Sequence, residues 1–334
     1  MFRRSLFYVV FALCVSSTFT LSAATISHAE TYTINAVAGW PETSFETQQF
    51  ITFLTLMQDE ADAKYPGELK LNYKGAGEVI HSREQVEALR SGLIEMVFTA
   101  GSYYTSVVPE IDTMSLTQLR PWEERAAGLN DYMEKIHNKK ANAHYLGRVG
   151  SGSLFHMFLN KPVNTIADLD GKKLRSSPTN IPLLKSVGAT PISMPPPDVY
   201  TAMERGVVDG FILPPATIRD FGLIKPSKYM IFPGFYEPVQ FLLVNLDAWK
   251  ALPKHLQELL DNGAQELAHY AIANITKHNL DEQKDFLKQG MIFTHLSAEE
   301  TAKFSKMAAD ALYKVVSKKA PVESKMILEM ITKK

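Results

Sequence analysis

Residues 161–178 decide the fold that the sequence indicates, and they read KPVNTIADLDGKKLRSSP. Asp170 and Gly171 predict a turn, because Asp bonds to nearby backbone groups and Gly accepts a positive φ. The turn leads into a short strand over 173–176. Ligands of open α/β sheets bind beyond the carboxyl ends of the strands, so this strand delivers Arg175 to a binding edge. The rigid fork of a guanidinium suits a carboxylate or a similar anion.

Two roles are open for Arg175 on the residues alone. It is either the anchor for an anion in a small-molecule cleft or a surface arginine that pairs with a neighbouring acid. We favour the anchor, and we expect the rest of the chain to build and close the cleft.

Short strands alternate with helices on both sides of this segment, which is typical of an α/β fold. The strand-like residues 145–159 and 239–245 are expected to cross between two lobes. No proline interrupts the helical pattern that begins at Pro253 and stops near Gly290, and such a helix would run ~50 Å and brace both lobes. A final helix over 297–317 is followed by a basic tail, which we expect to fray.

One unit recurs in the chain. When Gly92 is set over Gly206, Glu95 falls on Asp209, and each glycine follows a short helical pattern and precedes an apolar strand. The repeat indicates two lobes built to similar plans. The acids at these positions are therefore expected to serve a turn or a hinge rather than chemistry.

The N-terminus predicts export. Two arginines precede an apolar run, and a small-x-small cleavage signal ends at Ala29, so residues 1–29 read as a signal peptide. The single cysteine, Cys14, lies inside it, so the mature chain offers no thiol for a metal, a disulfide or catalysis. The mature chain holds 33 basic and 36 acidic residues, which gives no electrostatic footprint for nucleic acid.

The sequence contains no G-x-S-x-G, H-E-x-x-H or CxxC motif, and its nine histidines lack ligand spacing. We therefore expect no enzyme, no metal and no cofactor. An exported hydrolase that uses paired carboxylates stays open as an alternative.

Three stretches together resemble the extracytoplasmic solute receptors of tripartite ATP-independent periplasmic (TRAP) transporters, the DctP family. They are DLDGKKLRSSP (168–178), VGATPISMPPPDVYTAMERGVVDGFILPP (187–215) and AWKALPKHLQELL (248–260). The resemblance implies a two-lobed periplasmic binding-protein fold, type II-like, with hinge-crossing strands and a long helix. It also implies capture of an organic acid, with Arg175 as the carboxylate ligand, and delivery to the small and large membrane subunits of a permease.

From this resemblance we expect a periplasmic monomer that binds a small organic anion, and no nucleic acid. Lobe I is expected to comprise 30–152 and 239–278, and lobe II 153–238 and 279–334. A sensory protein that presents its ligand to a membrane receptor would share this sequence and stays open.

The chain departs from sialic-acid-binding members of the family at three places. It has Phe155 and Tyr103 where they carry arginines, and Leu213 where they carry an asparagine. An apolar pocket around one arginine favours a ligand with one anionic head and an apolar or aromatic body. The residues expected to bind the ligand are Arg175, Phe155, Phe211, Tyr103, Trp40, Leu213, Tyr236 and His156.

These side chains have structural alternatives. Aromatic side chains are more often core than pocket, and a lone histidine in an apolar strand is usually a core residue with its nitrogens satisfied. Arg148, which lies near the hinge, is expected to form a structural ion pair.

Overall fold

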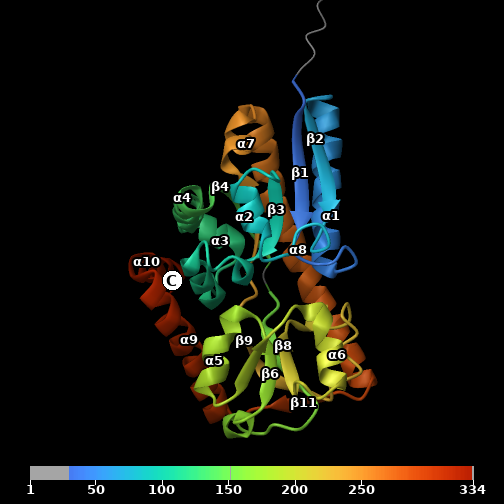
Figure 1. Cartoon of the computed structure of the whole chain (residues 1–334), viewed down its shortest axis with the longest axis vertical. Coiled ribbons are helices and arrows are strands. Elements are labelled where there is room, and N and C mark those ends of the chain that lie inside the picture. The colour runs from blue at the N-terminus through green and yellow to red at the C-terminus, as the bar shows by residue number, and fades with distance from the viewer. Residues whose placement is uncertain (1–29, 151, 333–334) are drawn as a thin grey trace, which may run out of the picture.

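The computed structural model describes residues 30–150 and 152–332, and they form two lobes that are each built on one β-sheet (Figure 1). Lobe I, at the top of Figure 1, contains a five-stranded sheet with the order β2-β1-β3-β10-β4. Lobe II, at the bottom, contains a six-stranded sheet with the order β11-β9-β5-β8-β6-β7. The predicted two-lobed α/β fold is therefore confirmed. The predicted signal peptide and Cys14 lie outside the described residues.

The sheet of lobe I is mixed. Strand β1 (Tyr32–Ala38) pairs in parallel with β2 (Leu69–Gly75) and β3 (Met96–Ala100), and β10 (Gln240–Asn245) runs antiparallel between β3 and β4 (Ala143–Gly150). The helical elements that accompany it are α1 (Phe45–Lys64), η1 (Gly101–Tyr103), α2 (Gln85–Arg90), η2 (Pro109–Leu116), α3 (Pro121–Ala126), α4 (Leu129–Ala141) and α7 (Leu246–Ala251).

The sheet of lobe II is also mixed, with β6 (Lys173–Ser176) parallel to both of its neighbours, β7 (Thr190–Ser193) and β8 (Gly210–Leu213). Strand β5 (Phe155–Leu159) runs antiparallel to β8 and to β9 (Tyr229–Phe235). The remaining elements of this part of the chain are η3 (Ile166–Leu169), η4 (Pro178–Asn180), α5 (Ile181–Ser186), η5 (Pro196–Asp198), α6 (Val199–Glu204), η6 (Pro215–Thr217), β11 (Ile292–His295) and α9 (Ala298–Lys319).

The chain crosses between the lobes at the two predicted places. The first crossing links β4 to β5, so the stretch expected as one strand over 145–159 is two strands of different sheets. Gly152, with φ of 91°, lies in this break, and glycine adopts that conformation without steric cost. The return crossing links β9 to β10.

The long helix α8 (Lys254–Lys288) has the predicted extent, and Figure 1 shows it passing from one lobe to the other. Pro253 is its N-cap, and Gly290 follows its end with a φ of 85°. Side chains in its first half, such as Leu260, pack in a core cluster of lobe I, whereas Phe286 packs in a cluster of lobe II. The helix therefore braces both cores.

The recurring unit has the same function in both lobes. The carboxylate of Glu95 accepts a hydrogen bond of 2.8 Å from the backbone N–H of Asn35 in β1. The carboxylate of Asp209 accepts one of 2.9 Å from the backbone N–H of Lys173 in β6. Each acid thus fixes the strand that neighbours the one it precedes, which is a structural role but not the turn or hinge that was expected.

Another glycine of lobe II, Gly210 at the start of β8, is required by packing. A Cβ atom on Gly210 would lie 2.3 Å from the backbone oxygen of Phe158 in the neighbouring strand. We expect Gly210→Ala to lower the free energy of unfolding by about 2 kcal/mol, because a backbone atom cannot give way as a side chain can. Urea denaturation measures the loss. Gly77→Ala is the control, since its Cβ would meet nothing within 4 Å, and equal effects would contradict this packing.

Residues 321–332 form a helix, so the expectation of a frayed tail is wrong for the part of the tail that the structure describes. Helix α10 (Pro321–Thr332) begins at a proline and buries Ile327 and Ile331. These side chains belong to a core cluster of lobe I, beside Leu129 and Met133 of α4. The exact domain boundaries stay a prediction, but α10, which was assigned to lobe II, packs on lobe I.

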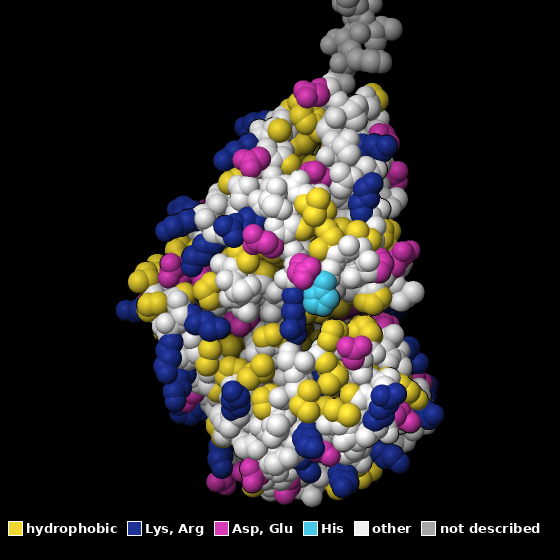
Figure 2. All heavy atoms as spheres, in the orientation of Figure 1, with side chains coloured by type: hydrophobic (Ala, Val, Ile, Leu, Met, Phe, Trp, Pro, Cys, Tyr) yellow, Lys and Arg dark blue, Asp and Glu magenta, His cyan; other side chains and the backbone are white. Residues whose placement is uncertain are grey.

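The two lobes meet at a waist, visible in the space-filling view of Figure 2. Acidic and basic side chains are interspersed over the face that this view shows. No helix among residues 30–150 and 152–332 is long and apolar enough to span a membrane.

Candidate ligand-binding site

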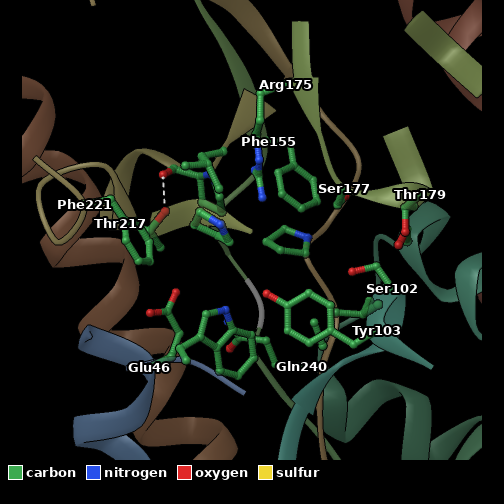
Figure 3. A pocket seen from close by; sticks show the side chains of 18 residues that line it. Glu46, Ser102, Tyr103, Phe155, Arg175, Ser177, Thr179, Thr217, Phe221 and Gln240 are labelled. Atoms are coloured by element: carbon green, nitrogen blue, oxygen red, sulfur yellow. Dashed lines mark hydrogen bonds between the residues drawn. The ribbon is translucent and has the colours of Figure 1, made fainter. Parts of the chain in front are cut away.

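A cavity of about 70 Å³ lies between the lobes, several times the volume that one water molecule needs. Its lining comes from both lobes and from the return crossing, as Figure 3 shows for the labelled residues. The lining residues are Trp40, Glu46, Ala100, Ser102, Tyr103, Ser115, Phe155, Arg175, Ser177, Thr179, Pro196, Leu213, Pro214, Thr217, Phe221, Pro238, Val239 and Gln240.

Arg175 stands at the carboxyl end of β6, as predicted, and its guanidinium points into the cavity in Figure 3. The residue is 3% exposed. Its Nε donates a hydrogen bond to the backbone oxygen of Met194 (3.0 Å), and its Nη1 donates one to that of Ile212 (3.1 Å). These two carbonyls fix the plane of the group and leave three of its five N–H donors for a ligand.

Arg175 forms no ion pair within the part of the chain that the structure describes, and Asp198 acts on its charge only from beyond ion-pair distance. No carboxylate among the described residues lies within 4.0 Å of its guanidinium. The alternative role of Arg175, an ion pair with a neighbouring acid, is therefore not the one that the structure shows. Burial lowers the pKa of Arg175 to about 10, so the group is still a cation at neutral pH. A buried cation without a counter-ion is costly, and an anionic ligand would remove that cost.

Four of the other predicted residues line the cavity with Arg175, namely Trp40, Tyr103, Phe155 and Leu213. The rings of Trp40 and Tyr103 pack with their centroids 6.0 Å apart on the side of lobe I, and Figure 3 shows Phe155 beside Arg175. Tyr103 is close enough to Arg175 for the positive charge to oppose the rise that burial causes in the pKa of its phenol. Whether these side chains bind a ligand stays a prediction.

The other three predicted residues lie in the core of lobe II, which corrects their expected placement. Phe211 is fully buried and stacks on Phe158 with centroids 5.1 Å apart. The ring of His156 packs against Phe232, and its Nδ1 lies 2.9 Å from the backbone oxygen of Ile231.

Burial lowers the pKa of His156 to about 4, so it is a neutral core histidine. Tyr236 is 6% exposed, and its hydroxyl donates to the backbone oxygen of Ala308 in α9. Both side chains have the satisfied core role that was weighed as the alternative.

The cavity is more polar than the sequence indicated. Hydroxyl side chains line it from both lobes, and Gln240 and Glu46 line it from lobe I. The sequence contains a sign that Gln240 faces a polar site, because it is a polar residue at the start of the largely apolar strand β10. Glu46 gave no signal, since an acid in the first turn of a helix is expected from the helix dipole alone.

Glu46 is 4% exposed, and its carboxyl group points into the cavity in Figure 3. Its Oε2 atom is buried and has no hydrogen-bond partner among the described residues. Burial raises the pKa of Glu46 to about 7, and a backbone hydrogen bond, the charge of Asp220 and a hydrogen bond from Gln240 modify it. The carboxyl group therefore titrates near neutral pH.

The lobes contact each other around the cavity. The backbone N–H of Phe45 donates to Asp220 Oδ2 (3.0 Å), and Arg83 Nη2 donates to Ser193 Oγ (3.0 Å). The hydroxyl of Thr179, which lines the cavity, donates to Asp112 Oδ1 at 2.6 Å. These contacts lie across the cleft and would have to break when it opens.

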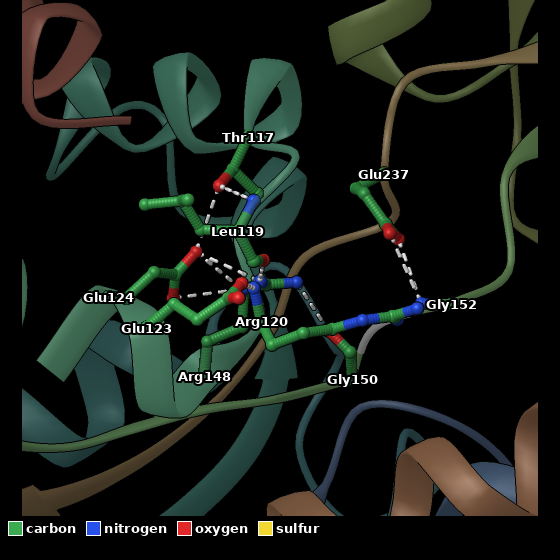
Figure 4. Close-up of polar contacts among 9 residues, drawn as sticks. All are labelled: Thr117, Leu119, Arg120, Glu123, Glu124, Arg148, Gly150, Gly152 and Glu237. Atoms are coloured by element: carbon green, nitrogen blue, oxygen red, sulfur yellow. Dashed lines mark hydrogen bonds and ion pairs between the residues drawn. The ribbon is translucent and has the colours of Figure 1, made fainter. Parts of the chain in front are cut away.

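A buried ion pair supports the first crossing, as was expected for Arg148 (Figure 4). Its Nη2 atom lies 2.8 Å from Glu124 Oε1, and both side chains are at most 1% exposed. The same guanidinium donates to the backbone oxygen of Leu119 and, at 3.0 Å, to that of Gly150 at the end of β4. Burial raises the pKa of Glu124, although Arg148 opposes the rise.

Two further hydrogen bonds fix the residues just beyond this pair. The backbone N–H of Gly152 donates to Glu237 Oε1 (3.1 Å) on the return crossing (Figure 4). Ser153 Oγ donates to Asn279 Oδ1 (3.0 Å) on α8. Hydrogen bonds thus join the first crossing, the return crossing and α8 at the hinge. Arg148 belongs to this hinge and does not line the cavity.

Among the described residues there is no group of three or more His, Cys, Asp or Glu side chains that could hold a metal ion. The chemistry that the cavity offers is therefore a fixed cation, a buried carboxyl group, hydroxyl donors and aromatic surface.

The model of the family "bacterial extracellular solute-binding protein, family 7" (DctP) matches residues 42–319. The chain is 26% identical over 277 residues to the monocarboxylate 2-oxoacid-binding periplasmic protein of Nostoc sp., an alignment that covers 78% of this chain and 74% of the relative.

Solved structures share the fold. A TRAP periplasmic solute-binding protein from Desulfovibrio salexigens with bound orotic acid superposes with a TM-score of 0.80 at 20% identity, over 90% of this chain and 97% of the other. A marine metagenome TRAP protein specific for aromatic acid ligands, in complex with 3-hydroxybenzoate, superposes with a TM-score of 0.76 at 22% identity, over 91% and 97%. Because the family model matches most of this chain, the chain belongs to family 7 of the bacterial extracellular solute-binding proteins, the receptors of TRAP transporters.

Proposed function

We propose that this protein is a periplasmic receptor that binds one small organic acid between its lobes and delivers it to the small and large membrane subunits of a TRAP permease. The observation that carries the proposal is Arg175, a buried cation held in place by two backbone carbonyls, with its free donors directed into the cavity. A carboxylate has the geometry to accept two of these donors at once.

The relatives support an acid as the ligand. The relatives named above bind 2-oxoacids, orotic acid and 3-hydroxybenzoate, and each of these is a small molecule with one carboxylate. In this chain, the carboxylate pairs with Arg175, and the body of the ligand packs against Trp40, Tyr103 and Phe155.

Closure of the lobes couples binding to delivery. The ligand contacts both lobes, so it favours the closed form by its differential affinity for that form. Exclusion of water strengthens the charge-assisted hydrogen bonds to Arg175. The permease then distinguishes loaded from empty receptors by their shape, and no step requires chemistry on the ligand. Co-purification with permease subunits would separate this function from that of a sensory receptor.

Pairs of acids and their primary amides test the proposal, because the amide keeps the shape and loses the charge. We expect benzoate-type, 2-oxo and short aliphatic acids to include a binder, and none of the matched amides to bind. At ~100 times its dissociation constant, a specific acid adds roughly 2.7 kcal/mol of stability, which a thermal-shift screen detects. A screen in which only amides, sugars or amines shift the melting temperature would contradict the proposal.

A further inference from the structure

The cavity has a second polar end that the capture of a carboxylate does not use. Figure 3 shows Arg175 and Glu46 on opposite sides of it, the first at the end of β6 and the second in the first turn of α1. Glu46 is 96% buried, and its carboxyl group is directed into the same space as the guanidinium.

A local structural role accounts for only part of this side chain. Glu46 lies at the N-terminus of α1, where the helix dipole favours an acid, and Gln240, which lines the same cavity, lowers the pKa of its carboxyl group. Its Oε2 atom still has no partner among the described residues. A methionine or leucine would fill the same place without that cost.

No base compensates the carboxyl group either. Among residues 30–150 and 152–332, no Lys, Arg or His nitrogen lies within 4.0 Å of it. The like charge of Asp220, from lobe II, raises the pKa of the carboxyl group further. A buried acceptor in a binding cavity is satisfied at little cost when the ligand supplies the donor.

We infer that Glu46 is a second recognition group of the site and accepts a hydrogen bond from an N–H or O–H at the end of the ligand opposite its carboxylate. The ligand class is therefore an acid with a distal donor, such as a hydroxy acid or an amino acid with its amine remote from the carboxylate. This inference rests on the proposed function, because it takes Arg175 as the anchor of the carboxylate.

Three acids of equal length test the inference, because they differ only in the group at the far end. They are 4-hydroxybutanoate with a neutral donor, 4-aminobutanoate with a cationic donor, and pentanoate with a methyl group. The pair 3-hydroxybenzoate and 3-methylbenzoate repeats the comparison on an aromatic body. In the wild type we expect the donor acids to bind about 10- to 100-fold more tightly than their methyl counterparts in calorimetry.

Two variants assign that preference to Glu46. Glu46→Leu removes the acceptor and should abolish the preference for both kinds of donor. Glu46→Gln keeps an acceptor oxygen without the charge, so it should retain the preference for the hydroxy acids and lose that for 4-aminobutanoate. Both variants should fold, since each removes a buried ionisable group, and their melting temperatures verify this.

The pH dependence separates a cationic donor from a neutral one. Burial raises the pKa of Glu46 to about 7, the groups that act on its charge are Asp220, Gln240 and Tyr103, and Arg175 lies across the cavity from it. Affinity for 4-aminobutanoate should rise as the pH increases through 7, because the ammonium needs the ionised carboxylate. Affinity for pentanoate should fall over the same range, because the ionised carboxylate then faces a methyl group. Both trends should vanish in Glu46→Gln.

The outcomes are distinct. If the acids bind and the three of equal length do so within about twofold of one another, in the wild type as in Glu46→Leu, the inference is overturned while the proposed function stands. In that case water, not the ligand, would supply the hydrogen bond to Oε2 of Glu46. If no carboxylic acid binds at all, the proposed function fails and the inference falls with it.

Discussion

Arg175→Met should lower the affinity for the carboxylate ligand at least about 100-fold. The substitution keeps an unbranched apolar stem but removes every donor, and two charge-assisted hydrogen bonds are worth about 3 kcal/mol or more. Arg175→Lys should still lose about tenfold, because an ammonium is a point charge that cannot match a carboxylate with two parallel donors. Calorimetry with the best acid from the thermal-shift screen measures both losses.

Stability and a control arginine separate this effect from misfolding. Arg175→Met removes a buried cation that has no counter-ion, so its melting temperature without ligand should equal or exceed that of the wild type. Arg90→Met serves as the control, because Arg90 is an exposed helix residue, and it should leave the affinity unchanged. Unaltered binding by Arg175→Lys would remove Arg175 from the site.

Glu124→Gln should lower the free energy of unfolding by about 3–5 kcal/mol. The change leaves Arg148 buried and charged beneath the first crossing, and an uncompensated buried charge is far more costly than the loss of the pair's own attraction. Urea denaturation with an unchanged m-value measures the loss.

A double variant and a surface pair provide the comparison for this result. Glu124→Leu combined with Arg148→Met removes both charges and should lose less than the single change. Glu60→Gln breaks the pair with Lys64, which is exposed on α1, and should cost under about 1 kcal/mol. Equal losses at the buried and the exposed pair would mean that the hinge pair is solvated.

The sequence predicted the elements whose signals are local. The turn at Gly171, the strand that ends with Arg175 and the helix between Pro253 and Gly290 depend on residues near each other in the chain. The helix α10 has a local signal too, a proline at its first position and isoleucines at 327 and 331, but its place at the chain terminus favoured fraying. Its burial depends on lobe I, which begins some 300 residues earlier in the chain.

The candidate site was predicted less well. Whether a residue lines the cavity depends on its position along its strand, at the end beside the cavity or in the middle of the sheet. Phe211 and Leu213 both pack with the same core cluster of lobe II, yet only Leu213, at the end of β8, reaches the cavity. The sheet of lobe II is buried on both faces, so hydrophobic alternation cannot tell a residue at the rim from one in the middle. Glu46 was missed because the residues that form the cavity with it are distant in sequence and come together only in the folded chain.

Because β1 and α10 both pack in lobe I, the described chain starts and finishes on the same half of the molecule. A pair of fluorophores attached to the two ends would therefore move together and report almost nothing when the receptor opens. One label must be placed within the segment between β5 and β9, where an exposed residue such as Lys185 would carry it with lobe II. The same arrangement lets a purification tag be fused to either end without obstructing the travel of the other half.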